Sequence, residues 1–265
     1  LIAAEANNGV GGVGVAWGAG VASLNFLEQV QLHSFGAVLA SFQHAANFDV
    51  MNNSWGFTPL YNSTQSLADP TSPASQGETA LAYTAANGRG GLGTIIVTAA
   101  GNDALNANGD GLTGTRLSVV VGAVDRYGNV TSYSNWGANL LVTAPDAAYT
   151  TDISGEGGYN SSGTADGDTL ADINYTSVFS GTSAATPVVS GVVALMLEAN
   201  PGLGWRDVHN ILALSARHTG SALGSGPSGN ELYGWTIANS GNWNGGGTEF
   251  NPNYGFGHVD ALAAV

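Results

Sequence analysis

The stretch from residue 176 to residue 200 constrains the fold of this 265-residue chain more than any other. A polar, glycine-containing turn at residues 179–183 runs directly into a long series of apolar or small residues. This series is too long for a typical strand and too often interrupted by Gly and Ser for a membrane span, so it predicts a buried helix. Pro187 is expected in the first turn, where a missing N–H costs nothing. Ser183 then lies at the N-terminus of a helix that is apolar on nearly every face.

A serine at such a helix start has two interpretations. The helix holds the hydroxyl rigidly, beside free backbone N–H groups and a positive dipole end. Nucleophilic acyl transfer needs such a fixed oxygen, together with donors for the developing oxyanion. The same position is also the ordinary one for an N-cap serine with no chemical role. These residues alone leave both interpretations open.

The charge balance disfavours several classes of partner. The chain has 19 acidic residues against five basic ones, all of them arginine, and a formal net charge of −14. So acidic a protein is not expected to bind nucleic acid or an anionic membrane, but it suits divalent cations and cationic peptides. There is no cysteine, which excludes disulfides and cysteine-based zinc sites. No uninterrupted apolar stretch of about 18 residues is present, so no membrane span is expected.

The order of the predicted elements indicates an α/β fold. Strands that alternate with helices predict a mostly parallel sheet with crossover helices. Residues 57–76 and 150–174 are expected to form surface loops. Strands are expected at residues 13–17, 21–26, 49–53, 94–99, 117–124 and 140–143. Besides the buried helix after Ser183, helices are expected at residues 1–6, 28–46, 78–87 and 205–215, with a short one at the end of the chain.

The eight residues from Ser180 to Pro187, Ser-Gly-Thr-Ser-Ala-Ala-Thr-Pro, closely resemble the nucleophile signature of the subtilisin-like serine proteases, or subtilases. Residues 195–208 and 89–102 resemble the kexin and proprotein-convertase branch of that family, and residues 253–261 resemble the close of its catalytic domain. The resemblance implies a three-layer α/β/α fold with a mostly parallel central sheet. It also implies that residues 1–265 are one catalytic domain that lacks its N-terminal part.

The resemblance implies a serine endopeptidase that cleaves protein or peptide substrates through an acyl-enzyme on Ser183. An Ala-Gly-Asn turn supplies the side-chain amide of the oxyanion hole in subtilases, and Asn102 matches that position. An amide suits the role because it donates a hydrogen bond without adding net charge. From the residues alone, an Asn just past a buried strand is also typical of a turn.

Three consecutive residues and one aspartate are implied in substrate binding. Ser54, Trp55 and Gly56 match a segment that lines the primary specificity pocket of kexin-like proteases, although Trp55 is also typical of a half-buried core aromatic. Asp110 matches an acid that helps to line a pocket for a basic side chain. The partner acid of that family is absent, because residues 57–59 read Phe-Thr-Pro. A strict preference for arginine is therefore not expected.

The segment at residues 5–12, which includes most of a glycine-rich loop at residues 7–14, is a candidate calcium site. Its carbonyls and an Asn side chain are hard oxygen ligands of the kind that calcium requires. Without the resemblance it is equally a plain glycine-rich turn. A calcium loop follows the catalytic-histidine helix in subtilases, and the match implies as ligands the Glu5 carbonyl, the Asn8 side chain and the carbonyls of Val10 and Gly12.

The base that a serine nucleophile needs is not evident in this chain. Subtilases carry their histidine in a His-Gly-Thr turn, and none of the histidines here precedes Gly-Thr. We therefore expect the catalytic Asp and His upstream of residue 1. The alternative is an inactive subtilase-like scaffold that acts as a binding or adhesion module. We further expect a secreted monomer. The histidines without an assigned role are His33, His44, His209, His218 and His258.

Overall fold

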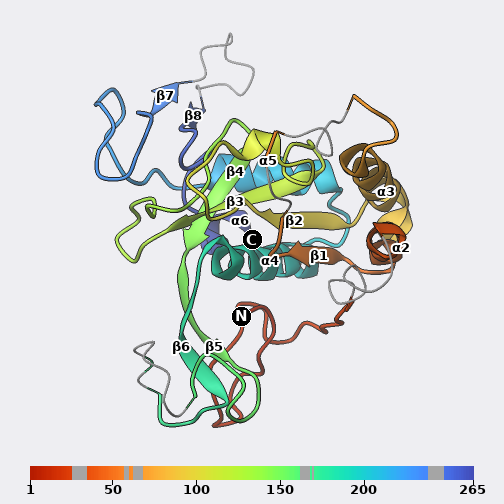
Figure 1. Ribbon diagram of the computed structural model, residues 1–265, viewed down its shortest axis with the longest axis vertical. Coiled ribbons are helices and arrows are strands. Elements are labelled where there is room, and N and C mark those ends of the chain that lie inside the picture. The colour runs from red at the N-terminus through yellow and green to blue at the C-terminus, as the bar shows by residue number, and fades with distance from the viewer. Residues whose placement is uncertain (26–34, 57–59, 62–67, 162–167, 169, 238–247) are drawn as a thin grey trace.

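A four-stranded parallel sheet lies at the centre of the computed structural model (Figure 1), which describes residues 1–265 except 26–34, 57–59, 62–67, 162–167, 169 and 238–247. Neighbouring strands pair in the order β1-β2-β3-β4, and every pair is parallel. Strands β2 and β3 are buried along their whole length, as expected for a parallel sheet that is covered on both faces. The strands are β1 (Val50–Asn53), β2 (Ile95–Ala99), β3 (Ser118–Val124) and β4 (Leu140–Pro145).

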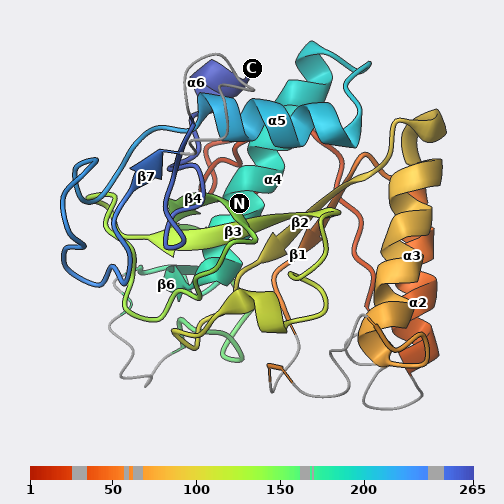
Figure 2. The same cartoon turned by 90° about the horizontal axis from the view of Figure 1, so that it is seen from above.

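Helices cover both faces of the sheet (Figure 2). Because side chains alternate along a strand, Ile95 and Val97 of β2 pack into the core cluster that includes α4 and α5, whereas Ile96 packs into the cluster of α2 and α3. The predicted three-layer α/β/α fold is confirmed. The helices are α2 (Phe35–His44), α3 (Pro73–Asn87), α4 (Thr182–Ala199), α5 (Trp205–Ser215) and α6 (Ala261–Ala264), with 3-10 turns η1 (Ala45–Asn47), η3 (Gly88–Gly91) and η4 (Ala107–Gly109).

Helix α4 is the buried helix that the sequence predicts. It contacts all four strands of the sheet, and 67% of it is buried, so it is a core helix although its length and composition would also allow a membrane span. It follows Gly181, whose φ of 93° lies in the left-handed region that glycine tolerates. The expected place of Pro187 is wrong: the helix begins at Thr182, so this proline is its sixth residue and lies in the second turn.

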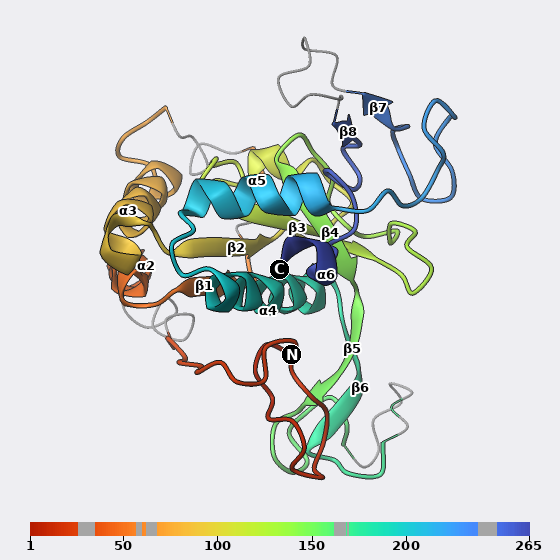
Figure 3. The ribbon, with the colours of Figure 1, turned by 180° about the vertical axis from the view of Figure 1, so that it is seen from behind.

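An antiparallel hairpin of β5 (Ala147–Thr151) and β6 (Tyr175–Ser180) extends away from the sheet (Figures 1 and 3). Strand β5 overlaps the first two residues of the region predicted as a surface loop, residues 150–174, and β6 begins directly after that region; neither strand was predicted. The N-terminal segment lies beside the hairpin, and a Cβ on Gly11 would meet the Tyr175 ring. A second short hairpin joins β7 (Thr236–Ile237) to β8 (Glu249–Phe250).

The helix predicted at residues 1–6 is wrong. The carbonyls of Leu1 and Ile2 instead accept hydrogen bonds from the backbone N–H groups of Val15 and Ala16, at 3.0 and 2.8 Å. Pairing with a following loop satisfies these carbonyls without the cost of starting a helical turn.

The strands predicted at residues 13–17 and 21–26 are also wrong over the described part, residues 13–25. Val13, Trp17 and Val21 are 59%, 58% and 70% exposed, so their apolar character does not reflect burial in a sheet. The glycines that separate them weaken a strand because they offer no side chain for packing.

Two predicted helices differ from the structure at their ends. The described part of the one predicted at residues 28–46 is α2 followed by η1, and residues 26–34 lie outside the description. Helix α3 begins five residues before the predicted residue 78. Ser72 accepts a hydrogen bond from the Ser75 N–H at 3.1 Å as its N-cap, and Pro73 occupies the first position.

Candidate active site

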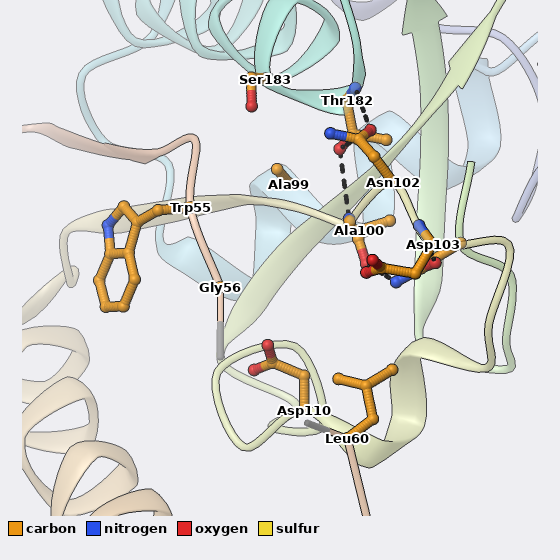
Figure 4. A pocket seen from close by; sticks show the side chains of 12 residues that line it. Trp55, Gly56, Leu60, Ala99, Ala100, Asn102, Asp103, Asp110, Thr182 and Ser183 are labelled. Atoms are coloured by element: carbon orange, nitrogen blue, oxygen red, sulfur yellow. Dashed lines mark hydrogen bonds between the residues drawn. The ribbon is translucent and has the colours of Figure 1, made fainter. Parts of the chain in front are cut away.

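The C-terminal ends of β1 and β2 meet the N-terminus of α4 around a cavity of about 210 Å³ (Figure 4). The structure brings all six predicted catalytic and substrate-binding residues to this place: five line the cavity, and Ser54 hydrogen-bonds to Ser183. Ligands of open α/β sheets bind beyond the carboxyl ends of the strands, as here. The lining residues are Trp55, Gly56, Leu60, Ala99, Ala100, Gly101, Asn102, Asp103, Asp110, Asn135, Thr182 and Ser183.

Ser183 is the second residue of α4 and forms reciprocal hydrogen bonds with Ser54. The Ser183 hydroxyl donates to the Ser54 carbonyl at 3.2 Å, and the Ser54 hydroxyl donates to the Ser183 carbonyl at 3.0 Å. In a regular helix the Ser183 carbonyl would accept from the N–H four residues later, but that residue is Pro187. The proline therefore leaves this carbonyl available to Ser54.

Two further side chains fix Ser54 on the same helix. The Asn52 amide donates to the Ser54 hydroxyl at 3.1 Å, and the Ser190 hydroxyl donates to the Asn52 side-chain oxygen at 2.9 Å. The end of β1 is thus hydrogen-bonded to α4 at two places, Ser183 and Ser190. Sequence reasoning missed Asn52 and Ser190. The only signal was the Ser190 hydroxyl within a mostly apolar helix.

Thr182 orients the amide of Asn102. The Asn102 side-chain oxygen accepts from both the backbone N–H and the hydroxyl of Thr182, each at 2.9 Å. Because a backbone N–H can only donate, the acceptor must be the amide oxygen, which fixes the side-chain orientation. The amide nitrogen is then on the side that faces Ser183 (Figure 4). Sequence reasoning missed Thr182.

The arrangement provides donors next to a hydroxyl. The first N–H groups of α4 have no acceptor within the helix, and the positive end of the helix dipole lies at Ser183. Together with the Asn102 amide, the Ser183 N–H is suited to hold negative charge on an oxygen beside the serine.

Asp110 forms part of the cavity wall and is only 5% exposed. One carboxylate oxygen accepts from the N–H groups of Leu112 and Thr113, at 2.6 and 3.3 Å. The other oxygen is close to Gly56: a Cβ at that position would come within 2.8 Å of it. The carboxylate is therefore held in place, and the close approach requires a glycine opposite.

Trp55 combines the two roles that the sequence left open. Its ring stacks on Phe42 of α2 with centroids 5.9 Å apart, and it packs at the edge of the α2–α3 cluster. It also lines the cavity beside Gly56. The half-buried ring thus joins the core to the cavity wall.

Within the described part of the chain, no histidine lines the cavity. His218 instead contacts Glu249 at 2.6 Å, and His209 packs edge-on against Trp205. Burial lowers the pKa of His209 to about 4. His44 is exposed at the end of α2, and His33 lies outside the described residues.

The loop predicted to bind calcium offers oxygen donors on an exposed, irregular backbone. Asn7, Gly9 and Gly11 have left-handed φ values of 62°, 73° and 60°. The Asn8 side-chain oxygen accepts from the Val10 N–H at 2.9 Å and retains a second lone pair. Among the residues that the structure describes, no three acidic or histidine side chains group as a metal site. Carbonyl and amide oxygens are nevertheless the ligand type that calcium accepts, so the donor set fits this ion.

Comparison with known proteins places this geometry in context. A family model described as the subtilase family matches residues 1–257. A calcium-dependent protease of Nostoc sp. is 32% identical and covers 98% of this chain, but the match spans only 38% of that protein. Proprotein convertase subtilisin/kexin type 7 of Homo sapiens is 34% identical over 81% of this chain and 26% of its own length. A crystal structure of a serine protease of Aeromonas sobria is 27% identical with a TM-score of 0.79, covering 99% of this chain and 51% of that one.

Proposed function

The chain belongs to the subtilase family, and on that basis we propose that it carries the nucleophile, oxyanion hole and substrate pocket of a serine endopeptidase. Ser183 attacks the carbonyl carbon of a peptide bond and forms an acyl-enzyme, which water then hydrolyses. The observation that carries the proposal is the Asn102 amide, which Thr182 orients beside the helix start that bears Ser183.

The oxyanion of each tetrahedral intermediate accepts hydrogen bonds from the Asn102 amide nitrogen and the Ser183 N–H. These donors are fixed before the reaction, so they stabilise charge without reorganising. For attack, the Ser183 hydroxyl leaves the Ser54 carbonyl and gives its proton to a base, which then protonates the leaving amine. We place that base, a histidine, and the aspartate that orients it upstream of residue 1.

Ser54, Trp55 and Gly56 bind the extended substrate backbone and form one wall of the specificity pocket, with Asp110 on another. A single buried carboxylate favours a basic side chain, and the net charge of −14 attracts cationic peptides over a longer range. We propose a secreted, monomeric enzyme that acts on proteins or peptides.

The loop at residues 5–12 is proposed to hold a structural calcium ion. Its ligands would be the carbonyls of Glu5, Val10 and Gly12 and the side-chain oxygen of Asn8. A bound ion would supply positive charge that cross-links this loop, and it takes no part in bond cleavage. The calcium-dependent protease among the relatives supports this assignment.

The test is covalent labelling of the whole natural protein with a serine-directed fluorophosphonate. We expect one adduct, on Ser183, and none in Ser183→Ala, whereas the matched variant Ser190→Ala in the same helix is labelled. Asn102→Ala should lower kcat by about 10²–10³-fold with little change in KM, because it removes a donor used in the transition state. An adduct on another residue, or labelling that survives Ser183→Ala, would contradict the proposal.

The alternative function is a binding module without catalysis, and it is favoured by the absence of a histidine among the described cavity residues. In that case the whole protein would bind peptides through the pocket beside Asp110 but would neither label nor cleave them.

A further inference from the structure

Asn135 lies in the turn between β3 and β4 and is buried, with 2% of its surface exposed. It lines the cavity together with Gly101, Asn102 and Asp103 of the turn that follows β2. Its backbone N–H donates to the Gly101 carbonyl at 2.9 Å. The β3–β4 turn is thus joined to the Asn102 turn through the backbone.

The side chain of Asn135 holds the Asn102 turn on both sides. Its oxygen accepts from the N–H groups of Asp103 and Leu105, at 3.0 and 2.9 Å. Its amide nitrogen donates to the Ala100 carbonyl at 2.9 Å. One side chain therefore binds the residue two places before Asn102 and the residues one and three places after it.

The turn needs such support because two of its residues have left-handed backbones. Gly101 has a φ of 102°, and Ala104, which has a Cβ, has a φ of 53°. A non-glycine residue in this region costs about 1 kcal/mol or more, so surrounding contacts must maintain it. Contact with Asn135 is also tight: a Cβ on Gly101 would come within 2.4 Å of the Asn135 amide nitrogen.

We infer that Asn135 is a positioning residue for the oxyanion hole, which acts on catalysis only through Asn102. The inference rests on the proposed function. Thr182 fixes the tip of the Asn102 side chain, while Asn135 fixes the backbone from which that side chain extends. An error of a fraction of an ångström in this backbone would move the donor from the developing oxyanion.

The chemistry of the site selects an amide at position 135. Two backbone donors face its oxygen and one backbone acceptor faces its nitrogen, so each end meets a complementary partner. A carboxylate would still accept from Asp103 and Leu105, but its second oxygen would oppose the Ala100 carbonyl. Asn135→Asp therefore keeps the volume and the two accepted bonds, but it loses the bond to the strand end and adds a negative charge.

The experiment is a double-mutant cycle between positions 135 and 102 in the whole natural protein, with kcat and KM measured on a peptide substrate. We expect Asn135→Ala and Asn135→Asp each to lower kcat about tenfold or more, with KM changed less than about twofold. In the Asn102→Ala background, each change should lower kcat much less than in the wild-type background, because the donor that Asn135 positions has been removed.

Asn253 provides the matched control. It is equally buried, at 2% exposed, and its side-chain oxygen also accepts from two backbone N–H groups, those of Leu232 and Tyr233. It lies outside the cavity lining. Asn253→Ala should lower the melting temperature, as Asn135→Ala does, but leave kcat unchanged in both backgrounds.

The outcomes separate the two proposals. An active wild-type enzyme in which the Asn135 variants lose kcat equally with and without Asn102 would overturn the positioning role alone. The same holds if Asn253→Ala reduces kcat as much as Asn135→Ala. If Asn135→Ala does not fold, the cycle with the isosteric Asn135→Asp decides. A wild-type protein that neither labels at Ser183 nor cleaves peptide would overturn the proposed function, and this inference with it.

Discussion

The carbonyl of Ser183 shows how a proline within a helix can serve a neighbouring strand. Pro187 removes the helical donor for this carbonyl, and the Ser54 hydroxyl at the end of β1 takes its place at 3.0 Å. The hydrogen bond that the helix lacks is thus replaced by one between two elements. Helix α4 and strand β1 are thus joined at Ser183, the proposed nucleophile.

This exchange predicts an energetic coupling between positions 54 and 187. We expect Ser54→Ala to lower the free energy of unfolding by about 1 kcal/mol, the usual net value of a hydrogen bond. In Pro187→Ala the new N–H competes for the Ser183 carbonyl, so Ser54→Ala should then cost distinctly less. Urea denaturation of the four proteins measures the coupling, and strictly additive effects would contradict the predicted competition.

Residues within short motifs were predictable, whereas those that act over long separations were not. Ser183 and Asn102, which line the cavity, were predicted as site residues because each lies in a compact sequence signature. Thr182 acts on Asn102 from 80 positions away, and Asn135 acts on Asp103 from 32. Their contacts depend on the packing of strand ends and loops, which local patterns do not encode.

At the scale of helices and strands, burial determined which elements could be predicted from the sequence. The four sheet strands and helices α4 and α5 were predicted because their apolar runs reflect real burial. The N-terminal segment was mispredicted because several of its large apolar residues remain exposed, and β5 was missed because its side chains alternate between partial and full exposure. Apolar character predicts structure only where a partner surface covers it.

Helix α5 carries a histidine that should make the stability of the protein sensitive to acid. Burial lowers the pKa of His209 from 6.5 to about 4, and its Nε2 atom has no hydrogen-bond partner among the residues that the structure describes. The unfolded chain therefore binds a proton at His209 more readily than the folded chain. The stabilisation that comes from a neutral His209 is fully present above pH 6.5 and is lost as the pH falls towards 4. The loss approaches about 1.4 kcal/mol per pH unit within that window.

The variant His209→Gln tests this expectation, because it cannot titrate. Its free energy of unfolding should vary less with pH between 6.5 and 4 than that of the wild-type protein, while the two profiles run parallel above pH 7. Chemical denaturation at a series of pH values makes the measurement. Equal slopes in the acid range would show that His209 is not responsible.

At the scale of the whole molecule, the net charge of −14 opposes compactness. Sodium chloride screens the repulsion between exposed carboxylates, so the melting temperature should rise gradually between ~10 mM and ~300 mM salt. If the loop at residues 5–12 binds calcium, calcium should raise the melting temperature further, at much lower concentration and to a saturating value. Differential scanning calorimetry distinguishes the two responses.

Asn8→Ala is the control for this prediction. It removes one proposed ligand without changing the charge, so it should abolish the calcium increment and preserve the sodium chloride response. A calcium response of undiminished size in this variant would place the ion elsewhere.

The hydrogen bonds of Thr182 affect which parts of the molecule can be replaced without moving Asn102. Its backbone and hydroxyl clip the Asn102 turn directly to the first residue of α4, and the Gly101 N–H donates back to the same hydroxyl at 3.2 Å. The spacing between Asn102 and Ser183 is therefore set by contacts among a few adjoining residues, none of which belongs to the β5–β6 hairpin that extends from the body. A hairpin of different length or composition at that place should therefore leave the hydrogen bonds between Thr182 and Asn102 intact.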